Sequence, residues 1–361
     1  MSAPLPTGST IGIIGGGQLG RMLAMAAARL GYGAIILEPQ PDCPAAQVAN
    51  SQIVANYDDR VALARLARAS NVVTYEFENV PVTAVQALAD TIPVYPPARA
   101  LEISQDRVTE KTFLNDRGIA TADFRPVDSG EDLRRALAAF NGNGVLKTRR
   151  LGYDGKGQRV LRNAAPAEAD DSYVAMGDVP LVLEAFVPFD REISIIAARG
   201  QDGALCAYEP AENVHCGGIL VKSTVPAAIS PKTADAAKDA AFTILEALNY
   251  VGVLGVEFFV LADGTLLVNE IAPRVHNSGH WTEAACVISQ FEQHIRAVAG
   301  LPLGTTNRHC DCVMENLIGD DVNRADALLR EPDLMLHLYG KAEARPGRKM
   351  GHFTRVTPRG G

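Results

Sequence analysis

A glycine-rich turn between an apolar strand and a helix is the feature that most constrains the fold. The β-branched run at residues 10–14 leads into Gly15, Gly17 and Gly20, which fit the G-x-G-x-x-G pattern, and a helical stretch follows. Further strands are expected at 34–37, 53–55 and 72–75, with a helix over 61–69 between the last two. Strands that alternate with helices predict an α/β domain with a parallel sheet and right-handed crossovers.

Length and composition exclude several classes of protein. A hydrophobic core rarely grows past ~300 residues, so 361 residues predict two or three domains. The hydrophobic share of 47% and the charged share of 21% are those of a folded globular chain, which excludes wholesale disorder. No apolar run reaches the ~20 residues of a membrane span, and the N-terminus lacks the pattern of a secretory signal. With a net charge of −8, we expect a cytoplasmic protein that binds neither membranes nor nucleic acid.

The six cysteines include no CxxC pair, and a long chain without a signal is poor ground for a disulfide framework. One cluster, His309-Cys310-Asp311-Cys312, contains residue types that bind metals. A structural zinc site needs a second ligand pair at suitable spacing, and none is apparent. We therefore interpret these cysteines as reduced thiols in the core or at the surface.

Two breaks in the pattern divide the chain. Pro93, Pro96 and Pro97 end the first strand–helix alternation, and the segment 300–304 precedes a region of short strands and turns. We expect an N-terminal α/β domain over 1–102, a central α+β domain over 103–300 and a small β-rich domain over 301–361. In the central domain, helices are expected over 105–117, 233–248 and 282–299, and strands at 145–148, 159–162, 181–186, 192–198, 204–209 and in a hairpin over 253–271.

The glycine turn at 15–20 has more than one functional interpretation. A strand-to-helix turn of this kind aims backbone N–H groups at a phosphate, and Glu38 lies near the place of the ribose-binding acid in dinucleotide folds. These features favour a nucleotide-cofactor oxidoreductase. Tight packing of helix on strand, or a site for another small anion or substrate, also explains the glycines.

A second glycine-rich stretch, residues 147–158, reads KTRRLGYDGKGQ. It lies between two expected strands, so it is a hairpin tip and does not match the Walker A loop, which opens a helix. Three glycines with four basic residues suit a mobile flap, over 148–158, that closes over a triphosphate. A solvated, flexible hairpin is the alternative.

The Asp263-Gly264 dipeptide predicts a hairpin whose register brings two acids together. With these two residues as the loop, Ala262 pairs with Thr265 and Glu257 faces Glu270, unless a bulge intervenes. Opposed like charges destabilise a sheet, and a divalent cation between them relieves the repulsion. Carboxylate oxygens beside a phosphate-binding flap suit Mg²⁺. The alternative is a solvated acidic face, but the neighbouring residues 259, 261, 266 and 268 are apolar.

Two polar loops complete the candidate site. Arg274, His276, Asn277 and Ser278 directly follow the hairpin and could position an anion and stabilise developing charge. The loop at 345–352, RPGRKMGH, is basic and suits a substrate phosphate, with a solvated turn as the alternative.

These motifs resemble a known family. The order of KTRRLGYDGKGQ, LEAFV with Glu192 beyond it, VEFF, VNEIAPRVHNSGHW and RPGRKMGH resembles that of the ATP-grasp ligases of purine biosynthesis, most closely those that carboxylate 5-aminoimidazole ribonucleotide. The resemblance spans nearly the whole chain, and NEIAPRVHNSGHW is its most diagnostic part. It implies an N-terminal Rossmann-like domain, a two-lobed ATP-grasp domain, ATP and Mg²⁺ as cofactors, bicarbonate and the ribonucleotide as substrates, and a homodimer.

The resemblance also implies roles for individual residues on the ATP side. Arg107 and Lys147 would contact the phosphates, and Glu257 and Glu270 would bind magnesium, with Ala272 where many relatives carry an Asn. The flap would contribute Gly152, Tyr153, Asp154, Gly155, Lys156, Gly157 and Gln158. The nucleoside would meet the backbone of Glu184, Ala185, Phe186 and Val187, the ribose-binding Glu192, and the pocket residues His215 and Asn269.

On the substrate side, bicarbonate would attack the γ-phosphoryl group to give carboxyphosphate, which then carboxylates the exocyclic amine. The implied catalytic residues are Arg274, Lys147, Tyr153, His276 and Asn277. The implied ribonucleotide contacts are Gln18, Leu19, Glu76, Tyr153, Asp154, Arg274, His276, Asn277, Ser278, Arg348 and Lys349, with the last two at the ribose phosphate.

Three alternatives remain at this point. A formate-dependent glycinamide ribonucleotide transformylase shares the glycine turn and the metal hairpin, although the VHNSGHW and RPGRKMGH stretches favour the carboxylating enzymes. An NAD-dependent dehydrogenase would use the glycine turn and Glu38 but leaves the opposed glutamates and the basic flap unexplained. A catalytically inactive binding module would not need the intact set of acids and bases.

Overall fold

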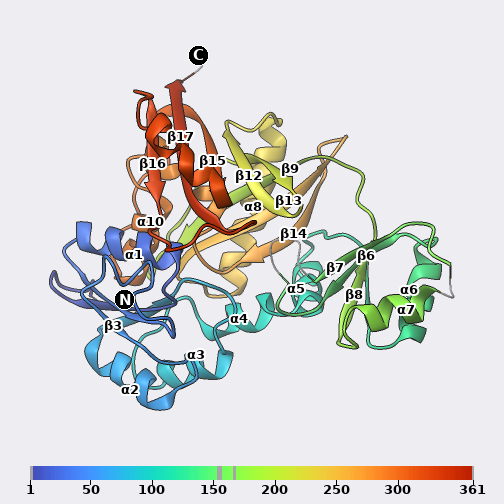
Figure 1. Ribbon diagram of the computed structural model, residues 1–361, viewed down its shortest axis with the longest axis horizontal. Helices are drawn as coiled ribbons and strands as arrows, with labels where there is room; N and C mark the ends of the chain where they lie inside the picture. Colours follow the sequence, from blue (N-terminus) through green and yellow to red (C-terminus); the bar gives the residue numbers. More distant parts are fainter. Residues whose placement is uncertain (1–2, 153–156, 166–167, 360–361) are drawn as a thin grey trace.

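The N-terminal part of the computed structural model is a parallel sheet, as the alternating pattern predicts. The structure describes residues 3–152, 157–165 and 168–359. The strand order is β3-β2-β1-β4, with β1 at Thr10–Ile14, β2 at Gly33–Leu37, β3 at Ser51–Ile53 and β4 at Val72–Tyr75. Helices α1 (Gln18–Arg29), α2 (Arg60–Ala69) and α3 (Val82–Ala89) pack around it (Figure 1). All four residues of β4 are buried, as expected for a strand covered on both faces.

A small lobe stands to one side of the molecule (Figure 1). Its antiparallel sheet has the order β5-β8-β6-β7, with bounds Phe124–Val127, Leu181–Glu184, Gly144–Thr148 and Gln158–Leu161. Helices α6 (Gly130–Ala139) and α7 (Glu168–Ala175) pack together beside this sheet, and α4 (Ala98–Ser104) and α5 (Arg107–Asn115) link the lobe to the N-terminal sheet. Leu133, Leu146 and Leu183 lie in its separate core.

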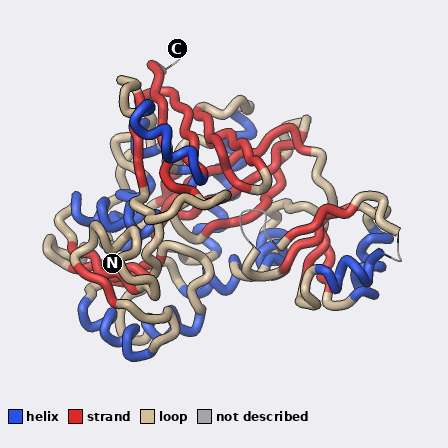
Figure 2. The backbone as a smooth tube through the Cα atoms, in the orientation of Figure 1, coloured by secondary structure: helices blue, strands red, loops and turns tan. Residues whose placement is uncertain are grey.

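The largest sheet crosses the boundary that the sequence places after residue 300. Its order is β14-β13-β9-β11-β12-β15-β17-β16, with β10 beside β9. Figure 2 shows its strands in red in the upper and central part of the molecule. The strands up to residue 272 are β9 (Phe189–Arg199), β10 (Leu205–Ala207), β11 (Ala211–Cys216), β12 (Ile219–Val225), β13 (Gly252–Leu261) and β14 (Leu266–Ala272). The later strands are β15 (Cys310–Ile318), β16 (Leu334–Leu338) and β17 (Lys349–Pro358).

The expectation of only short strands and turns after residue 300 is wrong. β15 has nine residues and β17 has ten, and they pair with each other along almost their whole length. The helical turns η2 (Gly319–Arg324) and α11 (Ala325–Leu328) connect β15 to β16. All six cysteines are free, and Cys310 and Cys312 are buried in β15.

The single helix expected over 282–299 is two helices. α9 (Thr282–Ala285) ends where Cys286 becomes extended, and α10 (Gln290–Val298) starts after Ser289, whose side chain accepts the Glu292 N–H as an N-cap. The short η1 (Asn277–Gly279) precedes α9. α8 (Pro231–Ala247), with 17 residues, packs on β9 and β13. Within the described ranges, no helix is both long enough and apolar enough to cross a membrane.

Candidate active site

The glycine turn after β1 holds protein carboxylates. The N–H groups of Gly17 and Gly20 donate to the two carboxylate oxygens of Glu76. The N–H of Gly16 donates to Glu38 Oε2 at 2.9 Å, and the Tyr57 hydroxyl donates to the same oxygen at 2.5 Å. Because these carboxylates occupy the N–H groups that a dinucleotide phosphate would need, the dehydrogenase interpretation is wrong.

The hairpin between β13 and β14 has a different turn from the predicted one. Leu261 N donates to Thr265 O at 2.9 Å, so the loop has three residues, with Gly264 at φ +83°. A two-residue loop at Asp263-Gly264 is therefore wrong, and the register near the turn is shifted by one residue. A β-bulge then shifts the register back beside Asn269. The predicted opposition of Glu257 and Glu270 is confirmed, because the two shifts cancel.

The opposed glutamates face a cavity of about 430 Å³. It lies where the carboxyl ends of β1 and β4 meet the end of β14, the edge at which open parallel sheets build their sites. It is lined by these predicted site residues: Gln18, Leu19, Glu76, Arg107, Gly152, His215, Glu257, Glu270, Arg274, His276, Asn277 and Lys349.

Three carboxylates meet on the β14 side of the cavity, and one of them was not predicted. Burial and the charge of Glu270 raise the pKa of Glu257 to about 7. The same two causes raise the pKa of Glu110 to about 8, although its Oε1 accepts the Ile271 N–H at 2.6 Å. Arg107 Nη1 lies 3.2 Å from Glu270 Oε2. The carboxylate oxygens on this side of the cavity are the ligand atoms that Mg²⁺ prefers.

The sequence contained a signal for Glu110 and for the next residue, Lys111. Positions 107, 110 and 111 lie at i, i+3 and i+4 of α5, so they share the helix face that carries Arg107. Lys111 is fully buried, and its Nζ lies 3.4 Å from Glu184 Oε1. A helix face that carries charges of both signs is usually exposed to water, so the sequence alone does not predict that these residues are buried.

Lys147 lies in a buried ion cluster with Glu184. Its Nζ is 2.9 Å from Glu184 Oε2, and Lys111 holds the other oxygen. Burial lowers the pKa of Lys147, while Lys147 and Lys111 together lower that of Glu184 to about 2 against the opposing effect of its own burial. Lys147 therefore stands behind the cavity wall with its charge balanced by protein.

The four residues whose backbone is expected to meet adenine, 184–187, lie at the end of β8 and in the segment after it. Glu184 pairs through its backbone with both β5 and β6. Ala185 N donates to Asp123 O at 2.8 Å, Val187 O accepts from Phe189 N at 3.0 Å, and the Phe186 ring lies 4.6 Å from the Arg162 guanidinium carbon. Part of the backbone expected to meet adenine thus already has protein partners.

Glu192 and His215 face each other across β9 and β11. Glu192 Oε2 lies 3.1 Å from His215 Nδ1. Burial opposes protonation of the ring, but the neighbouring carboxylates of Glu192 and Glu257 raise the pKa of His215 overall. At the bulge, Asn269 Oδ1 is buried without a hydrogen-bond partner among the described residues. An acceptor left unsatisfied in this way is suited to a ligand contact.

The loop after β14 is fastened on both sides. The Arg274 Nε–H donates to Glu78, a residue that the sequence did not single out. This partner, against the effect of burial, lowers the pKa of Glu78 to about 2. Asn277 exchanges amide hydrogen bonds with Asn316 at 3.0 and 2.7 Å. Arg274 and Asn277 are therefore held rigidly where they line the cavity.

His276 is a neutral hydrogen-bond donor in this arrangement. Its Nδ1 faces the Ser278 hydroxyl at 2.8 Å and the Ser278 N–H at 3.4 Å, and an N–H can only donate. The ring proton then sits on Nε2, which lies 3.5 Å from Glu257 Oε1. Burial, with the charge of Arg274, lowers the pKa of His276 well below its usual value. Ser278 is fully buried, and its hydroxyl accepts a hydrogen bond from the Ser194 hydroxyl. It therefore orients His276 and does not line the cavity itself.

The structure separates the two basic residues expected at the ribose phosphate. Lys349, at the start of β17, lines the cavity beside Glu257 and His276. Arg348 lies at a different pocket, and its Nη1 donates to Glu343 O at 3.0 Å in an exposed loop. The two side chains line different pockets in this structure.

The flap is only partly described. Tyr153, Asp154, Gly155 and Lys156 lie outside the described residues. Gly152 O accepts from Arg107 Nη2 at 3.4 Å. Gly157 O accepts from Thr148 N at 2.8 Å, and Gln158 pairs with Lys147 across β6 and β7. The hairpin predicted at the base of the flap is confirmed.

Three family models match the chain in order. The ribonucleotide synthetase preATP-grasp domain matches residues 8–105, the ATP-grasp domain matches 112–291, and the phosphoribosylaminoimidazole carboxylase C-terminal domain matches 312–359. Their order is that of the predicted architecture: an N-terminal Rossmann-like sheet, an ATP-grasp domain and a β-rich C-terminal part.

Individual relatives cover almost the whole chain. A protein of Brucella melitensis named N5-carboxyaminoimidazole ribonucleotide synthase is 67% identical over 98% of this chain and 98% of its own length. A Bacillus subtilis protein of the same name is 43% identical over 96% of this chain and 91% of its own length.

Solved structures agree with this similarity. An ADP complex of N5-carboxyaminoimidazole ribonucleotide synthetase superposes with a TM-score of 0.95 at 43% identity, covering 99% of this chain and 94% of that one. The Aspergillus clavatus synthase, in complex with ADP and 5-aminoimidazole ribonucleotide, has a TM-score of 0.91 at 30% identity, covering 98% of this chain and 95% of that one.

Proposed function

This chain belongs to the family of N5-carboxyaminoimidazole ribonucleotide synthases, and we propose that it carboxylates 5-aminoimidazole ribonucleotide with ATP and bicarbonate. The products are N5-carboxyaminoimidazole ribonucleotide, ADP and phosphate. One observation carries the proposal: the opposed Glu257 and Glu270 share a single cavity with Arg274, His276 and Lys349. Such a cavity can hold a metal-bound triphosphate and a second anionic substrate side by side.

In the first step, a bicarbonate oxygen attacks the γ-phosphorus of ATP, and ADP leaves, giving carboxyphosphate. Glu257 and Glu270 would hold Mg²⁺, which supplies charge neutralisation at the transferring phosphoryl group. Arg274 lines the cavity with its guanidinium held by Glu78, so it can neutralise a phosphoryl oxygen without reorganising. Arg107 also lines the cavity and would contact the phosphates, and Lys147 would reach them only by exchanging its contact with Glu184.

In the second step, phosphate leaves carboxyphosphate and its carboxyl carbon bonds to the exocyclic amine, either directly or after release as CO₂, and the released phosphate takes the amine proton. The neutral His276 can donate from Nε2 to a carboxylate oxygen but cannot remove a proton there. Asn277 and Lys349 line the same side of the cavity and would orient the ribonucleotide, with Lys349 at its phosphate. Closure of the flap over 148–158 would exclude water from the mixed anhydride.

Family membership supports two further proposals: the enzyme works in the cytoplasm, and it is a homodimer. The remaining residue roles set out from the resemblance, including those of Gln18, Leu19 and Glu192, are proposals on the same basis. Alanine variants at these positions, with the KM of each substrate measured in turn, would test these roles.

The deciding experiment measures ADP release with each substrate pair. We expect ADP formation to require Mg²⁺, bicarbonate and 5-aminoimidazole ribonucleotide together. Formate with glycinamide ribonucleotide serves as the matched control for the transformylase alternative. ADP release that responds to formate and glycinamide ribonucleotide, and is indifferent to bicarbonate, would overturn the proposal.

A further inference from the structure

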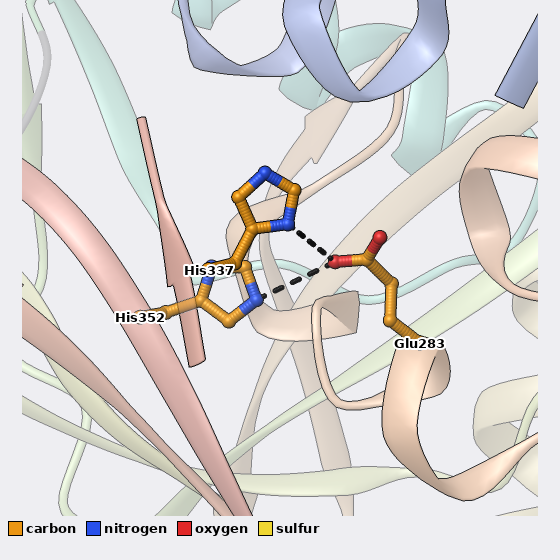
Figure 3. Close-up of side chains that lie close together, drawn as sticks. All are labelled: Glu283, His337 and His352. Carbon is orange, nitrogen blue, oxygen red and sulfur yellow. Dashed lines mark ion pairs between the residues drawn. The ribbon is translucent and has the colours of Figure 1, made fainter. Parts of the chain in front are cut away.

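A carboxylate and two imidazoles converge outside the candidate active site. Glu283 of α9 points at His337 of β16 and His352 of β17 (Figure 3). Its Oε2 lies 3.3 Å from His337 Nδ1 and 3.5 Å from His352 Nε2. These three atoms all lie within 4.8 Å of one another, and no other group of this kind occurs in the described part of the chain.

Strand pairing places the two imidazoles. His337 and His352 are directly opposed across the antiparallel pair β16 and β17, and their rings lie 5.3 Å apart at an angle of 25°. Both residues are buried, at 8% and 2% exposure. The Tyr339 hydroxyl, 2.8 Å from His352 Nδ1, fixes that ring with Nε2 turned toward Glu283. A hydrogen bond to the outer ring nitrogen is how metal-binding histidines are usually oriented.

The two oxygen–nitrogen separations suit a tetrahedral ion. Two ligands held by bonds of ~2.0–2.1 Å in a tetrahedron lie about 3.4 Å apart. The two oxygen–nitrogen separations of 3.3 and 3.5 Å match that value. In addition, Glu283 Oε2 is buried and makes no hydrogen bond of acceptable geometry with the described residues. Its contacts to the two imidazoles are therefore poorly aligned as hydrogen bonds, and a cation between the three side chains would satisfy this oxygen.

We propose that Glu283, His337 and His352 bind Zn²⁺. Two imidazoles and one carboxylate are a ligand set of that borderline metal and not of Mg²⁺. Water would be the fourth ligand. His280, whose ring lies 4.6 Å from that of His352, has a buried Nε2 without a partner among the described residues, and it would donate to that water.

The ion would fasten the C-terminal strands to the loop that carries His276. α9 follows that loop directly, and β17 begins at Lys349, three residues before His352. Lys349 and His276 line the same cavity. A metal ion bound by Glu283, His337 and His352 would therefore link the two chain segments that carry these cavity residues. The inference depends on the His–His–Glu geometry alone and stands whether or not the proposed carboxylation is correct.

The test uses Co²⁺ as a spectroscopic probe for the Zn²⁺ position. The full chain is stripped with a chelator and titrated with Co²⁺ in excess Mg²⁺, with absorption spectroscopy and calorimetry as readouts. We expect one equivalent of Co²⁺ to bind with the spectrum of a four-coordinate ion that has no thiolate ligand. Glu283→Gln and His337→Gln should each weaken binding by at least ~100-fold. Zn²⁺ should raise the Tm of the wild type but not of these variants.

Matched controls separate this site from others. Glu270→Gln removes a carboxylate of the proposed magnesium site. His309→Gln with Cys310→Ser removes two possible ligands from the histidine–cysteine segment at 309–312. All three changes should leave Co²⁺ binding intact. Absence of Co²⁺ uptake by the stripped wild type would overturn the proposal without any variant, and so would binding that survives His337→Gln but is lost in Glu270→Gln.

Discussion

The neighbouring cations Lys349 and Arg348 test how the cavity is divided. Lys349 lines the cavity, whereas Arg348 donates to Glu343 O in an exposed loop at another pocket. Changing each residue alone to alanine therefore has different expected results, although both remove one positive charge from adjacent positions. Each single variant is the matched control for the other.

The magnitude follows from the one contact that is lost. A charge-assisted hydrogen bond to a phosphate contributes about 1.5–3 kcal/mol, and about 1.4 kcal/mol corresponds to a tenfold change. Lys349→Ala should therefore raise the KM for 5-aminoimidazole ribonucleotide by about 10- to 150-fold. The KM for ATP should change by less than about twofold, because loss of binding to one substrate need not alter the pocket of the other. Arg348→Ala should change either KM by less than about twofold.

Steady-state kinetics with each substrate varied in turn is the assay. Lys147→Ala is the counterpart on the other side: it removes a cation beside Arg107 and leaves Glu184 with only Lys111, so it should impair ATP use first. The reasoning is refuted if Arg348→Ala raises the ribonucleotide KM as much as Lys349→Ala does. It is equally refuted if Lys349→Ala acts on the KM for ATP alone.

Three further predictions follow from the site. Glu270→Gln should lower ATP turnover by at least ~100-fold without loss of fold, since it removes a like-charge repulsion; near-wild-type turnover at saturating Mg²⁺ would refute this. The pKa of Glu110, about 8, exceeds its unfolded value of ~4.3, so the proton that stabilises the folded state is lost as the pH rises toward 8. The Tm of Glu110→Gln, measured relative to wild type, should therefore increase between about pH 5 and pH 8, and a constant difference would contradict the assignment. MgATP should raise the Tm and NADH should not, as measured by thermal shift; the reverse result would contradict the nucleotide site.

Local sequence patterns were enough for the parts of the fold that depend on them. The alternation of strand and helix predicts the N-terminal parallel sheet, and the Asp-Gly turn predicts the β13–β14 hairpin. The pairing of β15 with β17 involves segments about 40 residues apart, and no turn signal between them reports it. The continuity of the largest sheet past residue 300 is therefore a property of tertiary structure.

Within the site, the sequence identifies residues that belong to distinctive motifs. It does not identify charged residues that enter the site only because tertiary packing buries them. Glu110 and Lys111 lie on an ordinary-looking charged helix, and only packing against β14 and β8 removes them from water. Arg348 and Lys349 look equivalent in a basic loop. Lys349 begins β17 and lines the cavity, whereas Arg348 still belongs to the preceding loop, where its Nη1 donates to Glu343 O.

The glutamate pair depends on a detail that the turn signal does not contain. With the observed three-residue loop and no bulge, Asn269 would face Glu257, and Glu270 would point to the other face of the sheet. The bulge inserts one extra residue, restores the opposition of the two acids, and leaves Asn269 with an unsatisfied side-chain oxygen beside them. Bulges near active sites commonly re-aim side chains in this way. The predicted two-residue turn gave the right pair because the prediction left out two register shifts that cancel. The bulge is therefore what creates the geometry proposed to bind magnesium.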